Sequence, residues 1–207
     1  MAAHLPTIAG AVEPTFRLFC GNYRELTKAL TFYESPESTP LWIEAQPNLN
    51  SFYIIEEIIR LLHNFSTGAM TLVDHTRNEA DKLDSLPQLS SFRNEYNEEI
   101  QKRFAQNENH QLIQGLRNYM LHFSYVESYS NWKWTRDDGE KRTIRISIEP
   151  LLKWKKWKPL ARQRILHSGD HIIIHDVVND YYNDIKSFNN WLWVWQGRMV
   201  NSGILPM

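Results

Sequence analysis

The chain has 207 residues, of which 42% are hydrophobic and 23% are charged. These values exclude a disordered chain and allow one domain with a sizeable core. The net charge of −1 excludes a protein that binds nucleic acid through its overall charge. The single cysteine, Cys20, excludes an intrachain disulfide framework and any cysteine-based zinc cluster, and it is typical of a reducing compartment.

The chain shows no sign of a targeting or membrane segment. Residues 1–6 contain no basic stretch that leads into an apolar one, so we expect no signal peptide. No run of 18 uncharged apolar residues occurs, so we expect no contact with a membrane core. Together these features predict a cytoplasmic protein.

The first half of the chain predicts four helices, after an irregular segment over residues 1–14. Apolar residues at helical spacing place the helices at about 16–33, 51–83, 89–103 and 110–123. The second is the longest, and its main apolar row, which begins at Phe52, is typical of the central helix of a bundle. Residues 34–50 contain three prolines and predict a loop.

The second half changes character. Alternating and aromatic residues over 125–135 and 141–148 predict a β-hairpin that turns at Asp138-Gly139. A basic helix over about 151–166 and a last helix over about 171–195 follow. We therefore expect a mainly α fold in which residues 125–207, a hairpin and two helices, pack on a bundle formed by residues 1–124, as one compact unit.

The fourth predicted helix contains the pattern Arg117-Asn118-x-x-x-His122. Arginine is a permanent cation whose planar fork suits phosphate oxygens, and histidine transfers protons near neutral pH. Asn118 and His122 share a helix face, whereas Arg117 and His122 lie about 140° apart around the helix. The pattern can supply a phosphate clamp, an orienting amide and a proton-transfer group. Alternatively, Arg117 forms a salt bridge and His122 is simply solvated.

With this pattern late in a four-helix arrangement, residues 16–125 resemble the HEPN domain. That all-α fold has ribonuclease members with Arg-x4–6-His, often as Arg-Asn-x-x-x-His, on a late helix. The long second helix, with Leu62-His63-Asn64-Phe65 and Val73-Asp74-His75-Thr76-Arg77, and the order of helices add to the resemblance. It implies a HEPN-like helical bundle over residues 1–124.

The resemblance implies an RNA endonuclease that needs neither metal nor cofactor, with Arg117, Asn118 and His122 as catalytic residues. RNA supplies its own nucleophile, the 2′-OH, so the protein must provide proton transfer and a cation for the phosphorane. One chain supplies one such histidine, so the resemblance also implies a homodimer with a shared site. A toxin–antitoxin or phage-defence setting, with an antitoxin or other regulatory protein as partner, is implied in the same way.

A second hypothesis is a non-catalytic HEPN-like module that binds a partner protein or RNA. One observation separates the two hypotheses. A catalytic site needs Arg117 and His122 exposed in a cleft, whereas burial of both in salt bridges within one chain would exclude it.

A basic segment is the second candidate for contact with RNA. Residues 141–168 contain nine Lys or Arg and one acid, Glu149, a local net charge of +8. Basic residues interleaved with Trp154 and Trp157 can follow phosphates and stack bases. The alternative is an amphipathic helix with its tryptophans in the core, whose field still steers RNA. The RNA-binding candidates are Lys153, Lys155, Lys156 and Lys158.

Three further sets of residues have simpler explanations. His171 and His175, near His167, have the spacing of a metal pair, but the glutamate of an HExxH motif is missing and surface histidines are expected, so no metal site is predicted. The residues Asp74, His75 and His63 either support the site or are satisfied inside the bundle. The aromatic C-terminus predicts core packing, or else a partner surface; it comprises Phe188, Trp191, Leu192, Trp193 and Trp195.

Overall fold

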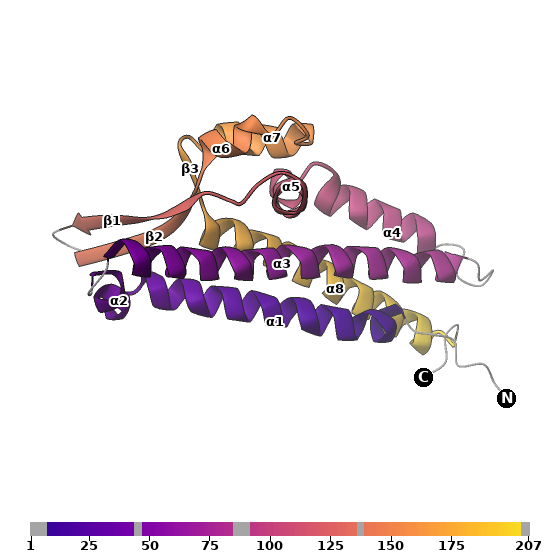
Figure 1. Cartoon of the computed structure of the whole chain (residues 1–207). Coiled ribbons are helices and arrows are strands. Elements are labelled where there is room, and N and C mark those ends of the chain that lie inside the picture. Colours follow the sequence, from indigo (N-terminus) through magenta and orange to yellow (C-terminus); the bar gives the residue numbers. More distant parts are fainter. Residues whose placement is uncertain (1–7, 44–46, 85–91, 136–138, 204–207) are drawn as a thin grey trace.

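The computed structural model describes residues 8–43, 47–84, 92–135 and 139–203. The expectations for residues 1–7, Leu89 and the turn residue Asp138 lie outside these ranges. The fold is mainly α with a small antiparallel sheet, as the sequence predicted (Figure 1). In the described residues, no helix is both long and apolar enough to cross a membrane.

Three long helices form the body of the molecule. α1 (Ile8–Glu34) and α3 (Pro47–Asp84) lie side by side in opposite directions, and α8 (Ile174–Asn201) packs against α1 (Figure 1). α5 (Glu108–His122) crosses α3 and contacts α8. The shorter helical elements are η1 (Pro36–Ser38), α2 (Thr39–Ile43), α4 (Phe92–Ile100), the π-helix η3 (Gln101–Ala105), α6 (Ile148–Lys153) and α7 (Pro159–His167).

An aromatic seam joins the three long helices. It consists of Phe19 from α1, Phe65 from α3 and Tyr181 from α8, whose ring centroids lie 5.2 to 6.2 Å apart. Beside it, Tyr23 and Tyr182 stack at 3.6 Å with nearly parallel rings. Because all three residues of the seam are fully buried, the C-terminal helix completes the core that the N-terminal helices begin.

The sheet has three strands in the order β1-β2-β3. β1 (Ser128–Thr135) and β2 (Gly139–Ser147) pair antiparallel from Ser128↔Ile146 to Thr135↔Gly139, and Gly139 has a φ of +70°, which favours glycine. The hairpin is therefore confirmed. The sequence did not predict β3 (His171–Ile173), which pairs with β2 and leads directly into α8.

Arg142 attaches the hairpin to the helices. It lies on β2 with 2% of its surface exposed, and its guanidinium stacks on Trp132 at 3.9 Å from the ring centroid. Its hydrogen-bond acceptors are Tyr33 O (3.1 Å), Ser38 Oγ (2.7 Å), Thr39 Oγ1 (2.9 Å) and the Glu140 carboxylate. One side chain thus joins β1 and β2 to the end of α1, η1 and α2.

Two segments of the N-terminal half that contain prolines were expected to be irregular and are helical instead. Residues 8–14 are helical, with Pro14 inside α1, because Ile8, Ala9 and Val12 are buried and Gln196 Oε1 of α8 accepts a hydrogen bond from Ala9 N (3.0 Å). Residues 36–43 and 47–50 are also helical. Each proline there lies at the start of a helix, where its missing N–H has no partner to lose.

The predicted basic helix over 151–166 is wrong because Pro159 interrupts it. The residue before a proline is disfavoured in the α conformation, and Lys158 is extended (φ −61°, ψ 153°). The helix is therefore divided into α6 and α7, with non-helical backbone over 154–158. The last helix begins at Ile174 instead of 171, because residues 171–173 pair as a strand.

Arg142→Ala should lower the free energy of unfolding by about 3–5 kcal/mol, because it leaves the largely buried Glu140 carboxylate without its cation and the acceptors at Tyr33 and Ser38 without their donor. Urea denaturation followed by far-UV circular dichroism measures this change. The control is Lys141→Ala on the exposed side of the same strand, which should change stability by no more than about 0.5 kcal/mol. Equal effects of the two substitutions would contradict the anchoring role of Arg142.

Candidate active site

α5 presents the predicted motif on a helix with a well-formed start. The Asn107 side chain accepts a hydrogen bond from His110 N (2.9 Å), and Glu108 in the first turn is favourable for the helix dipole. One side of the helix is buried, through Leu112, Ile113, Leu116 and Tyr119. The core therefore fixes the rotation of α5 and, with it, the directions of the three motif residues.

Arg117 faces the crossing with α3. Three residues before it, Gln114 lines a cavity, and three residues after it, Met120 lines a groove together with His63 of α3. Arg117 is half-buried, its Nη1 donates to Asn118 Oδ1 (3.0 Å), and its Nε is buried without an acceptor. Among the described residues it has no carboxylate partner, so the salt bridge of the simpler interpretation is absent.

His122 is the last residue of α5, and its side chain is exposed. No hydrogen bond joins it to Arg117 or Asn118, or to any other residue within the described ranges. The structure thus brings Arg117 and Asn118 together and leaves His122 apart, as the angle of about 140° between positions five residues apart requires. One chain therefore holds Arg117 and His122 on different sides of the helix.

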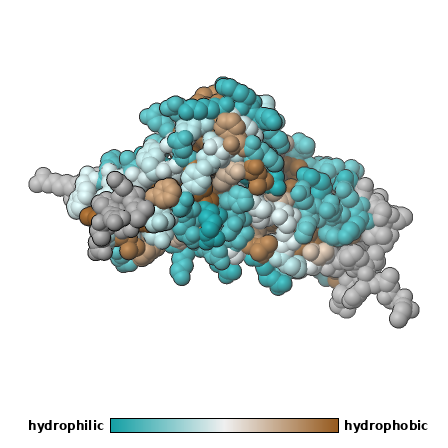
Figure 2. Space-filling view, in the orientation of Figure 1, coloured by the Kyte–Doolittle hydropathy of each residue, from teal (hydrophilic) through white to brown (hydrophobic). Residues whose placement is uncertain are grey.

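Exposed apolar side chains lie at the end of α5 and at the start of α3. We call them the apolar rim: Phe52, Tyr53, Leu121, Phe123 and Tyr125, which are between 44% and 57% exposed. Figure 2 shows hydrophobic residues exposed among hydrophilic ones on the face where α5 and α3 cross. From the sequence, Phe52 was expected to be buried with the apolar row of its helix, and this surface was not predicted. Phe123 and Tyr125, which follow the motif, were the only residues that could have indicated it.

A shallow groove of about 520 Å³ lies within the apolar rim, between α3 and the end of α5. Tyr53, Met120 and Tyr125 form its apolar walls. Burial, with a smaller contribution from a nearby glutamate, raises the pKa of Tyr125. Arg60 donates two hydrogen bonds of 2.7 Å to the Glu57 carboxylate, and these bonds lower the pKa of that carboxyl group. Two glutamates and one arginine therefore line the groove, and Glu56 has no ion-pair partner among the described residues.

The basic segment lies over α5. The four candidate lysines Lys153, Lys155, Lys156 and Lys158 are exposed, whereas Trp154 and Trp157 are buried and pack on Tyr119. The tryptophans thus serve the core and are not available to stack bases. Lys158 Nζ donates to Gln114 Oε1 (3.2 Å), one turn before Arg117, so the basic surface and the motif belong to one assembly of α5, α6 and α7.

Three of the remaining candidates have structural partners, whereas His63 lines the groove and its side chain has none among the described residues. His75 shares a hydrogen bond of 2.6 Å with Thr15 on α1, and Asp74 pairs with Arg77. His175 bonds to Glu34 (3.1 Å), and that bond raises the pKa of His175. In the described part of the chain, no group of three potential metal ligands comes together.

The aromatic C-terminus is divided between core and surface. Trp195 is fully buried and contacts Phe92 of α4 at 4.3 Å between ring centroids. Phe188 is buried and stacks on the half-buried Trp191. Trp193, in contrast, is 42% exposed. Core packing therefore explains most of this segment.

The chain was compared with models of protein families, with curated proteins and with solved structures, and none of them matches it. The functional proposal therefore rests on the sequence motif and on the geometry of the site.

Gly115→Ala should destabilise the protein, because a Cβ at Gly115 would lie within 3.0 Å of two carbons of the Trp157 indole. That ring cannot easily move, since it is buried and its Nε1 donates to Leu151 O (2.7 Å). We expect a loss of about 1–3 kcal/mol in thermal unfolding. The control is Gly21→Ala in α1, where no atom lies within 4 Å of the added Cβ and a gain of about 0.5–1 kcal/mol is expected. Similar gains for both would show that α5 and Trp157 do not pack closely.

Proposed function

We propose that this protein is a metal-independent RNA endonuclease of the HEPN type, with Arg117, Asn118 and His122 at its active site. The observation that carries the proposal is the state of Arg117. Its guanidinium is half-buried, is aligned by the Asn118 amide and has no carboxylate partner among the described residues. A structural arginine would ordinarily be neutralised, so an unpaired cation at this position is suited to an anionic ligand such as a phosphodiester.

The chemistry follows from what RNA and these side chains supply. A neutral imidazole takes the proton of the 2′-OH, the 2′ oxygen attacks the adjacent phosphorus, and the bond from phosphorus to the 5′ oxygen breaks. An imidazolium gives its proton to the leaving 5′ oxygen, and the products are a 2′,3′-cyclic phosphate and a 5′-hydroxyl. The Arg117 guanidinium stabilises the extra negative charge on the phosphorane.

This reaction needs two proton-transfer groups, and one chain provides only His122. We infer that two chains meet at the apolar rim, around a two-fold axis, so that His122 and the partner subunit's His122 face one cleft. Burial of the five exposed apolar side chains of the rim would favour this dimer. In the dimer, an arginine and a histidine that lie apart in one chain can approach each other across the interface.

The exposed lysines of the basic segment are the RNA-binding surface in this proposal. They supply phosphate contacts without sequence readout, because their neighbouring tryptophans are buried. A cytoplasmic toxin–antitoxin or phage-defence setting, with an antitoxin or regulatory protein that restrains the nuclease, completes the proposal by analogy with the family it resembles. The alternative proposal is a non-catalytic HEPN-like module, for which the same rim would bind a partner protein.

The purified protein should cleave single-stranded RNA in the presence of EDTA and leave 2′,3′-cyclic phosphate ends that mass spectrometry detects. His122→Ala and Arg117→Ala should each lower the rate by about 100-fold or more, because they remove proton transfer and charge stabilisation. Arg117→Lys should restore only part of the activity, since a lysine lacks the planar fork.

The matched control is His167→Ala, since His167 is also an exposed histidine in the last turn of a helix. It should cleave at the rate of the unaltered protein. Loss of cleavage in EDTA would refute the mechanism. An unchanged rate of cleavage by the His122→Ala protein would refute it as well.

Phe123→Asp should convert the dimer to a monomer and lower cleavage in parallel, because a charge on the apolar rim cannot be buried without a partner. Sedimentation velocity over a range of concentrations measures the oligomeric state. Leu166→Asp, at a similarly exposed apolar residue of α7, is the control and should leave the dimer intact. A monomer that cleaves RNA at the full rate would contradict the shared site.

A further inference from the structure

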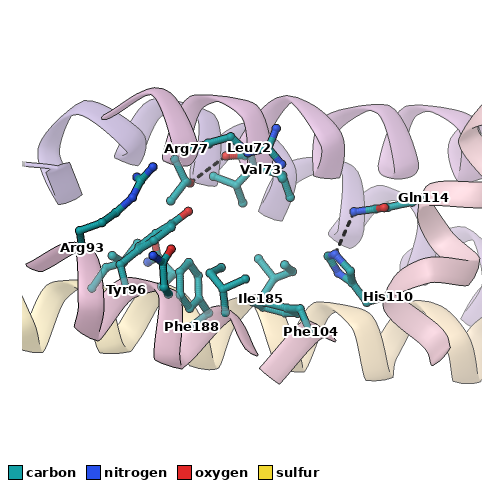
Figure 3. A pocket seen from close by; sticks show the side chains of 15 residues that line it. Leu72, Val73, Arg77, Arg93, Tyr96, Phe104, His110, Gln114, Ile185 and Phe188 are labelled. Atoms are coloured by element: carbon teal, nitrogen blue, oxygen red, sulfur yellow. Dashed lines mark hydrogen bonds between the residues drawn. The ribbon is translucent and has the colours of Figure 1, made fainter. Parts of the chain in front are cut away.

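A second candidate site lies away from the apolar rim, in a cavity of about 260 Å³ between α3, α4, α5 and α8 (Figure 3). Its apolar walls are Leu72, Val73, Ile100, Phe104, Ile185, Phe188 and Leu192. An engineered cavity of about 150 Å³ holds one benzene ring. By that measure the present cavity has room for about one fused pair of rings, or for one ring with a short chain.

Two polar side chains in this cavity lack partners. Asn189 is only 6% exposed and lines the cavity, yet its amide has no hydrogen bond to any described residue. Tyr96 is 7% exposed, and its hydroxyl likewise has no partner in the described part of the chain. The polar atoms of both side chains are accessible within the cavity, so both are available to bond a polar atom of a ligand.

The two ends of the cavity differ in charge. Arg77 and Arg93 lie at one end, and His110 and Gln114 lie at the other (Figure 3). Arg77 pairs with Asp74 through Nη1 only (3.3 Å), so its other N–H groups remain for a second anion. The guanidinium groups line the cavity, whereas their aspartate partners do not.

At the other end, the His110 imidazole is uncharged. Burial lowers the pKa of His110 to about 4, so the ring carries no charge at pH 7. Gln114 Oε1 accepts from Lys158, which leaves Gln114 Nε2 to donate to His110 Nε2 (2.9 Å). The imidazole also stacks on Tyr181 and contacts Phe104. This end therefore offers flat, uncharged surfaces to an aromatic ring.

We propose that this cavity binds a small aromatic carboxylate, with its carboxylate toward the end that holds Arg77 and Arg93 and its ring against Phe104 and Phe188, whose own rings are in edge contact. Asn189 and Tyr96 then hydrogen-bond to a polar atom of the ring or of its side chain. The apolar walls, a few convergent polar groups and the single charged end are the usual features of a small-molecule site. The proposal does not depend on RNA cleavage.

Isothermal titration calorimetry with indole-3-acetate tests the proposal, with indole-3-acetamide as the uncharged comparison. We expect one site per chain and at least about tenfold weaker binding of the amide, because it cannot pair with an arginine. Arg77→Gln should remove this preference for the acid. Arg17→Gln, at an exposed arginine that also pairs with an acid on its own helix, is the control and should change nothing.

Asn189→Leu gives a second, independent test. The leucine removes an unpartnered buried amide, so the variant should be at least as stable as the unaltered protein and yet bind indole-3-acetate about tenfold more weakly. Absence of binding at millimolar indole-3-acetate, equal binding of acid and amide, or binding that neither variant alters would each overturn the proposal. A loss of stability in Asn189→Leu would show that the amide has a structural partner and would also count against it.

Discussion

The packing of Phe19, Phe65 and Tyr181 is the contact on which the other elements depend. It holds α1, α3 and α8 at fixed distances, because three fully buried rings leave no room for a sliding helix. α5 then crosses α3 and contacts α8, and its buried side sets which way the motif residues point. The cavity beneath α4 and the groove beside Met120 lie on the two sides of that crossing.

On the proposed function, the arrangement of α5 is half of a site that a second chain completes. Arg117 has no carboxylate partner among the described residues, His122 lies exposed on another side of the helix, and the apolar rim is open to solvent. None of these three features stabilises an isolated chain. A second copy of the chain would change all three at once. The basic segment does not need a second chain to hold its position, because Trp154 and Trp157 are already buried in the core of one chain.

The sequence predicted the fold class because long periodic helices and an alternating hairpin are local signals. It failed where a local signal was ambiguous. Prolines at positions 36, 40 and 47 start helices instead of preventing them, and residues 171–173 became a strand only because β2 offered an edge. For the candidate site, spacing alone gave the angle between Arg117 and His122. Within the described ranges, Arg117 forms no ion pair and the Asn189 amide no hydrogen bond, and both results depend on contacts between distant helices, which no spacing reveals.

The bond between Ala9 N and Gln196 Oε1 joins residues 187 positions apart, and it has a consequence for synthesis on the ribosome. α1 and α3 are translated early and can pair, but the tyrosine that completes their aromatic seam lies on the last helix. Until α8 has emerged, the nascent chain exposes Phe19 and Phe65, so the core forms only after α8 has been made. During this interval, the chain would be a natural client for molecular chaperones.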